Sequence, residues 1–355
     1  MISAKQWVKT FLTLSLFAFY SIGLINYTID PMWTFNHMNK FNKIQEGFNE
    51  RQQKSNYVYF NKLNQFDGIL LGSSRTSFIN QYDFSPIKIY NYSLNSIYPF
   101  EYKKYIDFAK KNSSNRFKYI IIGIDFYGSK IPNMKTIKFY SPEHYFNNSL
   151  SFLYRYKMLI LKDTLEKSLI NIKNSVKNHK QYGFSRNNIR YHPKVSEAER
   201  VKRYLANIKR HTEEMSNKKY TYNKNYINIL KQIQIDNPQS KFIIFTSPIT
   251  ANLLVSIIKK GNRLQEYERW LKETISVFGE VHHFMNINTV TKNLQNYADD
   301  DHYYPYIGTL IAHKLINKKD SNIPKDFGIL LNNKNINKFL IKLNQEIEKY
   351  KLSRH

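Results

Sequence analysis

The sequence predicts an α/β protein with a three-layer α/β/α domain, a helical insertion and one preceding transmembrane helix. Three observations lead to this prediction. Short apolar runs alternate with segments of helical periodicity, as in proteins built from strand–helix units. Three of those runs are continuously apolar, as expected for strands of a parallel sheet that is covered on both faces. An uncharged segment near the N-terminus is long enough to cross a bilayer.

Composition narrows the classes of protein that remain. The chain has 355 residues and 42% hydrophobic content, enough for a core, so wholesale disorder is excluded. Lys and Arg total 54 against 27 Asp and Glu, a formal charge of +27 that favours anionic partners. Without any Cys, disulfide scaffolds, Cys-ligated zinc and thiol catalysis are excluded.

Residues 1–30 form the expected membrane anchor. Residues 10–29 are 20 residues without a charge, and at about 1.5 Å per residue they match the roughly 30 Å hydrocarbon core. Lys5 and Lys9 precede this run, so the positive-inside rule places the N-terminus in the cytoplasm and the rest outside it. A cleaved signal peptide is the alternative interpretation. Envelope polymers or lipid headgroups then become the expected anionic partners, and no nucleic acid is expected.

The expected strands follow a polar connector. Residues 31–64 are rich in Asn, Gln and Lys and are read as that connector. The α/β/α domain then spans residues 65–320. Its five apolar runs are residues 68–72, 87–91, 119–124, 242–245 and 281–285. Helical spacing between the runs, as in residues 102–109 and 226–233, supplies crossover helices, so we expect a flavodoxin-like parallel sheet.

Residues from about 128 to 220 interrupt the alternation and contain no strong strand signal. Apolar residues there recur at steps of three and four and predict one amphipathic helix; they are Met158, Leu161, Leu165, Leu169 and Ile172. Residues 151–220 hold 17 Lys or Arg against 6 Asp or Glu. This basic insertion is either a solvated face or a platform for an anionic polymer or lipid headgroups. Residues 321–355 are expected to form a loop and a final helix.

A turn of small polar residues follows the first strand. It reads Gly72-Ser73-Ser74-Arg75-Thr76, and a ligand of an open α/β sheet binds beyond the carboxyl ends of its strands. Backbone N–H groups at the start of the next helix could stabilise an oxyanion there. Taken alone, the turn favours a simple helix N-cap over a functional site.

A second polar segment, Asp299-Asp300-Asp301-His302, precedes the last apolar helix of the domain. Asp299, three residues before His302, can orient the imidazole while the ring takes a proton from a serine. Asp300 and Asp301 are expected to be solvated and to contribute little. No metal and no cofactor are expected. Catalytic activity should rise with pH as His302 loses its proton, with a midpoint near the unperturbed histidine pKa of about 6.5.

These two segments together resemble the SGNH (GDSL-like) hydrolase and acyltransferase superfamily. The resemblance covers residues 67 to about 316. It extends to the superfamily's membrane-anchored envelope branch, which includes alginate O-acetyltransferase-like proteins and teichoic acid D-alanyl transfer proteins. Gly72-Ser73-Ser74 stands where the family has Gly-Asp-Ser, which implies Ser74 as nucleophile, and Asp299-x-x-His302 matches the late Asp-x-x-His block.

The middle blocks of the family are matched less closely. The resemblance implies oxyanion or substrate-binding roles near Asn95 and Ser96, where the backbone N–H of Ser96 could donate. The third block usually carries Asn, whereas this chain has Asp125. An ionised carboxylate cannot donate a hydrogen bond, so Asp125 is expected to be structural or to bind Arg75.

The resemblance therefore implies a membrane-anchored, extracytoplasmic serine esterase or O-acyltransferase. Its substrates would be acyl esters of a cell-envelope polysaccharide or related polymer, with an acyl donor protein as a further candidate. The alternative is a non-catalytic factor that binds or assembles an envelope polymer and keeps only the fold.

Overall fold

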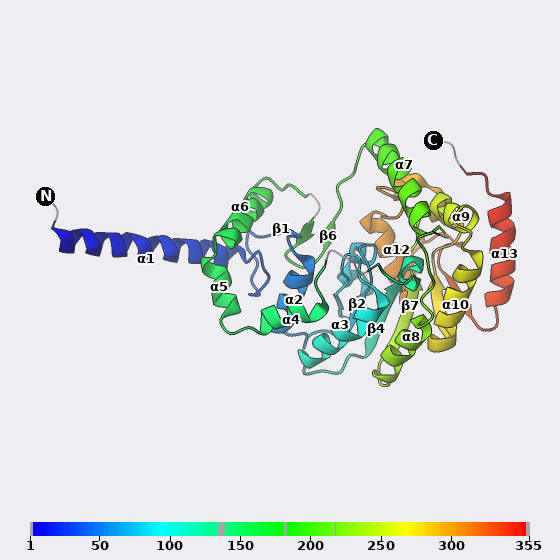
Figure 1. The fold of residues 1–355 in the computed structure, drawn as a ribbon, viewed down its shortest axis with the longest axis horizontal. Coiled ribbons are helices and arrows are strands. Elements are labelled where there is room, and N and C mark those ends of the chain that lie inside the picture. The colour runs from blue at the N-terminus through cyan, green and yellow to red at the C-terminus, as the bar shows by residue number, and fades with distance from the viewer. Residues whose placement is uncertain (1–2, 134–138, 181–182, 217, 353–355) are drawn as a thin grey trace. The chain divides into compact units, whose positions relative to one another are not determined.

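The computed structural model describes residues 3–133, 139–180, 183–216 and 218–352. The chain divides into two compact units. The N-terminal unit comprises Met1–Lys62 and Ser141–Tyr191, and the sheet unit comprises Leu63–Tyr140 and His192–His355. The sheet unit is α/β with a mostly parallel sheet (Figure 1).

The sheet of the sheet unit has six strands in the order β3-β2-β4-β7-β8-β9. The first five run parallel, and β9 pairs antiparallel with β8. The strands are β2 (Gly68–Leu71), β3 (Ile89–Asn91), β4 (Tyr119–Ile124), β7 (Lys241–Thr246), β8 (Glu280–His283) and β9 (Ile329–Asn332). The five expected runs therefore all contain strands, but β9 was expected to be loop, and its direction makes the sheet mixed.

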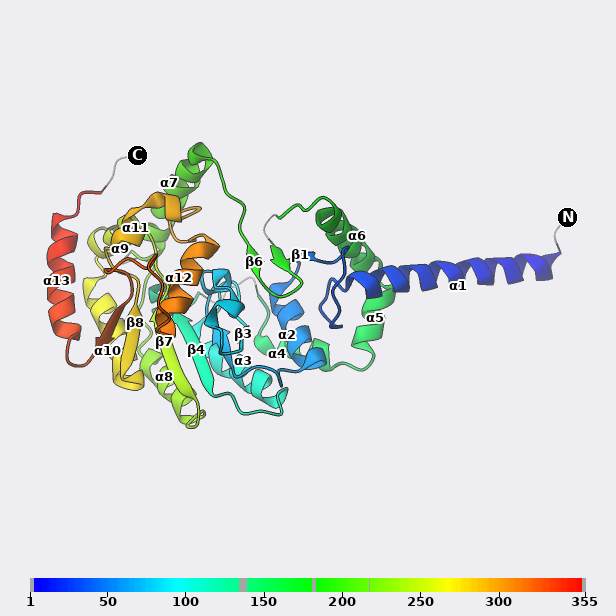
Figure 2. The ribbon, with the colours of Figure 1, turned by 180° about the vertical axis from the view of Figure 1, so that it is seen from behind.

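Helices cover both faces of this sheet. Its helices are α3 (Pro99–Lys111), α7 (Glu197–Glu214), α8 (Tyr226–Ile235), α9 (Ala251–Lys259), α10 (Leu264–Phe278), α11 (Thr289–Lys292), α12 (Pro305–Leu315) and α13 (Ile336–Lys349). Figures 1 and 2 show the strands between α3, α8 and α10 on one side and α12 on the other. Leu70, Ile121 and Phe245 pack with Ile307 and Ile311 of α12 in one buried cluster. Alternate strand residues face the opposite way, so both faces are apolar.

The N-terminal unit begins with α1 (Ala4–Ile29), which is long and apolar enough to cross a membrane. It continues with β1 (Ile44–Glu46), α2 (Glu50–Asn61), α4 (Pro142–Leu150), α5 (Tyr154–Ile160), α6 (Lys162–Val176), β5 (Gly183–Ser185) and β6 (Arg190–Tyr191). Strands β1, β5 and β6 form a small antiparallel sheet.

Two parts of the N-terminal unit differ from the sequence expectation. The expected polar connector contains β1 and α2, whose buried polar side chains are hydrogen-bonded; Gln52, for example, donates to the Tyr145 carbonyl at 3.1 Å. The expected single helix through Met158 and Leu169 is instead α5 and α6, separated at Leu161, whose backbone is extended. Strands β5 and β6 lie in the same stretch, where no strand was expected.

Candidate active site

Ser74 lies in a tight turn directly after β2. The turn needs glycine at position 72, where φ is 151° and a Cβ would lie 2.1 Å from Thr76 Oγ1. The Ser77 hydroxyl donates to the Ser74 carbonyl at 2.5 Å, and a short 3₁₀ helix at Thr76–Phe78 follows. Ser74 is therefore held at the carboxyl end of a central strand of the parallel sheet.

His302 lies in the loop between α11 and α12, which is held by a bridge of its own and by a contact with α9. Tyr297 and Tyr303 pair as an antiparallel bridge on either side of the loop. Thr250, the N-cap of α9, donates to the Asp300 carbonyl through its N–H at 3.0 Å and its hydroxyl at 2.9 Å. Two elements thus fix this loop at the same edge of the sheet as Ser74.

The structure brings Ser74, His302 and Asp299 together. Ser74 Oγ lies 3.0 Å from His302 Nε2, and His302 Nδ1 lies 2.9 Å from Asp299 Oδ2. Asp299 Oδ1 accepts the backbone N–H groups of Asp301 at 3.0 Å and His302 at 2.7 Å. A proton on Nδ1 donates to the carboxylate and leaves Nε2 as the acceptor of the serine proton. This is the geometry of a nucleophile, its base and an orienting acid.

A second carboxylate also approaches the imidazole. Asp301 Oδ1 lies 2.9 Å from His302 Nδ1, although the hydrogen bond to Nδ1 is made by Asp299. Burial alone would lower the pKa of His302, but the charges of Asp301 and Asp299 and the hydrogen bond to Asp299 outweigh it and raise that pKa to about 10. Burial would raise the pKa of Asp301, but His302 and Arg75 hold it well below the usual value. The resting imidazole is therefore more basic than the sequence suggested.

Arg75 and Asp125 form a buried ion pair beside the triad. Arg75 Nη2 lies 3.2 Å from Asp125 Oδ2, and the two side chains are 11% and 8% exposed. Burial would lower the pKa of Arg75, but Asp125 and Asp301 outweigh it, so the pKa is raised. This is the pairing expected for Asp125, and it engages the carboxylate with a guanidinium.

Asn95 and Ser96 follow the segment that pairs with the nucleophile turn. The Leu94 N–H donates to the Gly72 carbonyl at 2.9 Å, which aligns this segment with the start of the turn. Asn95 is half-buried, and Ser96 is exposed with a φ of 50°. Their role in stabilising an oxyanion stays a prediction.

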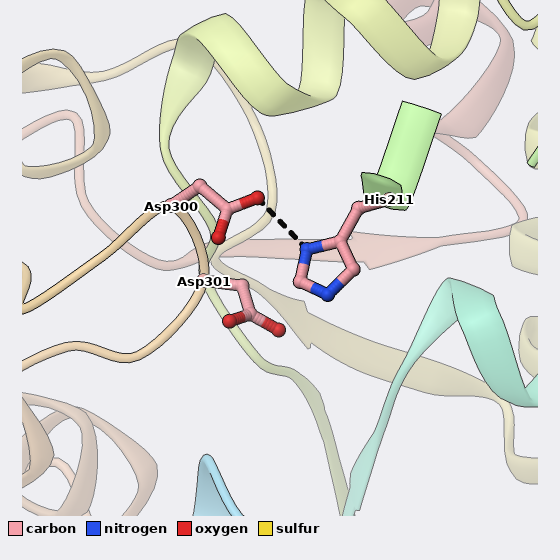
Figure 3. A group of neighbouring side chains, drawn as sticks. All are labelled: His211, Asp300 and Asp301. Atoms are coloured by element: carbon pink, nitrogen blue, oxygen red, sulfur yellow. Dashed lines mark hydrogen bonds and ion pairs between the residues drawn. The ribbon is translucent and has the colours of Figure 1, made fainter. Parts of the chain in front are cut away.

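Asp300 points toward the imidazole of His211 on helix α7 (Figure 3). Its side chain is fully buried, contrary to the expected solvated carboxylate, and its Oδ2 lies 2.8 Å from His211 Nδ1. Burial raises the pKa of Asp300 to about 6, and hydrogen bonding to Asp300 raises the pKa of His211 against the effect of burial. Packing of α7 against the loop therefore gives this carboxylate a histidine partner.

Two groups of side chains have the spacing of metal ligands within the described ranges. They are His211 with Asp300 and Asp301, and Asp299 with Asp301 and His302, with ligand atoms within 4.8 Å of one another. In both groups the Nδ1 atom of the histidine is already hydrogen-bonded to a carboxylate. The Nδ1 atoms therefore already serve in the His211–Asp300 and His302–Asp299 contacts.

Sequence reasoning missed His211 and the contact of Asp301. His211 lies 89 residues before Asp300, in α7, within the stretch that the sequence marks as basic. Asp301 does not have the Asp-x-x-His spacing, and only the folded loop brings its carboxylate to the ring. Neither residue carries a signal in the linear sequence.

No protein-family model matches the chain, and neither does any curated protein or solved structure.

Proposed function

We propose that this chain is a membrane-anchored serine hydrolase or O-acyltransferase that acts on acyl esters outside the cytoplasm. The contact chain from Ser74 through His302 to Asp299 carries the proposal. Ser74 and His302 are 228 residues apart in the sequence, and Asp299 lies 3 residues before His302. Two different loops carry them, and they meet at one edge of the sheet. That arrangement is the one needed to activate a serine near an ester.

The architecture supports the same proposal. Numbered along the chain, the five parallel strands follow the order 2-1-3-4-5, which is the flavodoxin-like order. In such sheets the ligand lies beyond the carboxyl ends of the strands, where Ser74 stands. The motif resemblance to SGNH hydrolases and acyltransferases implies the same fold and the same nucleophile.

The proposed mechanism has two halves. Neutral His302 accepts the Ser74 proton at Nε2 as Oγ attacks the ester carbonyl, and Asp299 stabilises the imidazolium. The imidazolium then returns the proton to the leaving alcohol, which yields an acyl-Ser74 intermediate. His302 next deprotonates water or an acceptor hydroxyl, which attacks the acyl group and releases Ser74. Water gives an esterase, and a sugar hydroxyl gives an acyltransferase.

The proposed setting follows from the N-terminus. Helix α1 would cross the membrane with Lys5 and Lys9 on the cytoplasmic side. The main domain would then meet envelope polymers, a donor protein or lipid headgroups, to which its net charge is suited. A reporter that is active only outside the cytoplasm, fused after His355, should be active, and one that is active only inside should be silent. The reverse pattern would remove the envelope setting.

A non-catalytic polymer-binding factor is the second candidate. It is favoured by Asp125, which stands where the family has a donor Asn and whose carboxylate is engaged by Arg75. Such a factor would keep the fold without turnover.

Hydrolysis of 4-methylumbelliferyl acetate by the full-length protein in detergent separates the two candidates. Ser74→Ala and His302→Ala should each remove nearly all turnover, because nucleophile and base act as a unit. Ser276→Ala, an exposed serine on α10, is the matched control and should keep full activity. Equal rates in all four proteins would favour the binding factor. Adding an envelope glycan with free hydroxyls then tests whether the acetyl group reaches sugar instead of water.

A further inference from the structure

Large apolar side chains cover the outer surface of α5 and α6 in the N-terminal unit. We call this surface the α5–α6 face. It includes Phe152, Leu153, Tyr156, Ile160, Leu169 and Val176, which are 87%, 49%, 60%, 52%, 52% and 64% exposed. Phe152 and Leu153 come just before α5. Exposed large apolar side chains gathered on neighbouring helices mark an interaction site on a stable protein.

The inner side of α6 is polar, which is the reverse of a helix that packs on a soluble core. Ser168 donates to Asn26 Oδ1 at 2.8 Å, Asn171 donates to Gln45 Oε1 at 2.8 Å, and Ser175 accepts the Ile44 N–H at 3.0 Å. Ser168, Asn171 and Ser175 are buried, whereas Leu169 and Val176 point outward. The fold therefore uses the polar face of α6 to hold the unit together and leaves the apolar face for another medium.

Both helices adjoin the end of α1. Asn26, in the last turn of α1, donates to the Leu159 carbonyl of α5 at 2.8 Å and accepts from Ser168 of α6. Figures 1 and 2 show α5 and α6 beside the C-terminal end of α1 and away from its N-terminal end. If α1 crosses a bilayer, α5 and α6 lie where it emerges.

The charges on these helices match a membrane surface. Exposed lysines alternate with the apolar side chains, and they are Lys157, Lys162, Lys173 and Lys177. Acidic residues in the same two helices are Asp163 and Glu166. Interfacial helices combine an apolar face with lysines that reach anionic headgroups.

We propose that the α5–α6 face lies in the headgroup–acyl boundary of the membrane that α1 crosses, with its lysines toward anionic headgroups. The inference rests on the anchor assigned to α1 in the proposed function. The α5–α6 face would be a second attachment to the membrane, lying along its surface. Such an attachment beside the anchor would limit rotation of the N-terminal unit about α1.

The absence of cysteine makes the test direct, because each single-Cys variant carries one label. The full-length protein, labelled with the fluorophore NBD at Phe152→Cys or Leu169→Cys, is placed in phosphatidylglycerol nanodiscs. Lipids carry a nitroxide quencher either near the headgroup or at the bilayer centre. Leu16→Cys in α1 reports the anchor, and Ile341→Cys, equally exposed on α13 of the sheet unit, reports the unquenched baseline.

We expect the label at both α5–α6 positions to lose most of its emission with the headgroup-level quencher and less with the central one. The label at Leu16→Cys should lose most emission with the central quencher. Quenching at Leu16→Cys without quenching at the α5–α6 positions would overturn surface docking and keep the anchor. No quenching at Leu16→Cys would overturn the anchor itself. NBD emission that is typical of an apolar environment but is not reduced by either lipid quencher would mean that protein covers this face. That result would also overturn the proposal.

Lysine reversal separates headgroup attraction from apolar insertion. Replacing Lys157, Lys162 and Lys173 by Glu should reduce quenching at Leu169→Cys in phosphatidylglycerol and leave it unchanged in neutral phosphatidylcholine. The same loss in both lipids would contradict the assigned role of the lysines.

Discussion

The Asp301→Asn substitution should speed the reaction of Ser74 at neutral pH. With a His302 pKa of about 10, only about one molecule in a thousand holds a neutral base at pH 7. Asp301 Oδ1 lies 2.9 Å from His302 Nδ1, and one such charge shifts a pKa by about 1 to 3. Removing it should increase the rate at pH 7 between about tenfold and about 1000-fold, with the alkaline plateau unchanged.

The rate of Ser74 labelling by a fluorophosphonate measures this directly. The full-length protein is labelled from neutral pH to well above pH 10, and the signal of Ser74→Ala is subtracted. The wild-type rate should rise with pH through a midpoint near 10, because only neutral His302 accepts the serine proton. Asp301→Asn should move that midpoint toward neutral pH.

Two controls separate charge from orientation. Asp107→Asn, on the exposed face of α3, should leave the profile unchanged. Asp299→Asn should lower the plateau itself, because Asp299 holds both the ring and the His302 N–H. A wild-type midpoint near 6.5, or identical midpoints in wild type and Asp301→Asn, would refute the assigned role of the second carboxylate.

Three further substitutions test the supports of the site. Gly72→Ala should destabilise the protein by about 1–3 kcal/mol in urea and slow labelling, because φ is 151° there; an unchanged labelling rate would contradict this. Arg75→Gln should cost about 3–5 kcal/mol by leaving Asp125 unpaired, and an unchanged urea midpoint would show that the pair is not buried. His211→Ala should cost about 1–3 kcal/mol at mildly acidic pH. Folding raises the His211 pKa, so this cost should shrink as pH rises through the folded value; a pH-independent cost would contradict the pairing with Asp300.

The sequence predicts the sheet well because its signal is local. Apolar runs mark the five parallel strands, three of them continuously, and the run at 119–124 coincides with β4. The same reasoning missed β1, α2, β5 and β6 of the N-terminal unit, where side chains such as Gln52 are buried through hydrogen bonds instead of hydrophobicity. Hydropathy patterns carry no record of such pairs. Strand β9 overlaps a Gly-Ile-Leu-Leu run identical to that of β2, so a local signal was present there and the expected loop was wrong.

The contacts of the candidate site also divide into those that the sequence predicts and those that it does not. The Asp299–His302 contact spans one turn, and the Asp299 carboxylate closes that turn, so spacing alone predicts it. The meeting of Ser74 with His302 follows from the topology, since both stand at the carboxyl edge of the sheet. The burial of Asp300 and its pairing with His211 depend on how α7 packs, which no local pattern encodes.

Peptide mapping of the fluorophosphonate adduct tests the central claim most directly. The full-length protein is labelled near pH 10, digested and sequenced by mass spectrometry. We expect one adduct, on Ser74, that is lost in Ser74→Ala and in His302→Ala and retained in Ser276→Ala. An adduct on a different serine, or none at alkaline pH in protein that is shown to be folded, would contradict it.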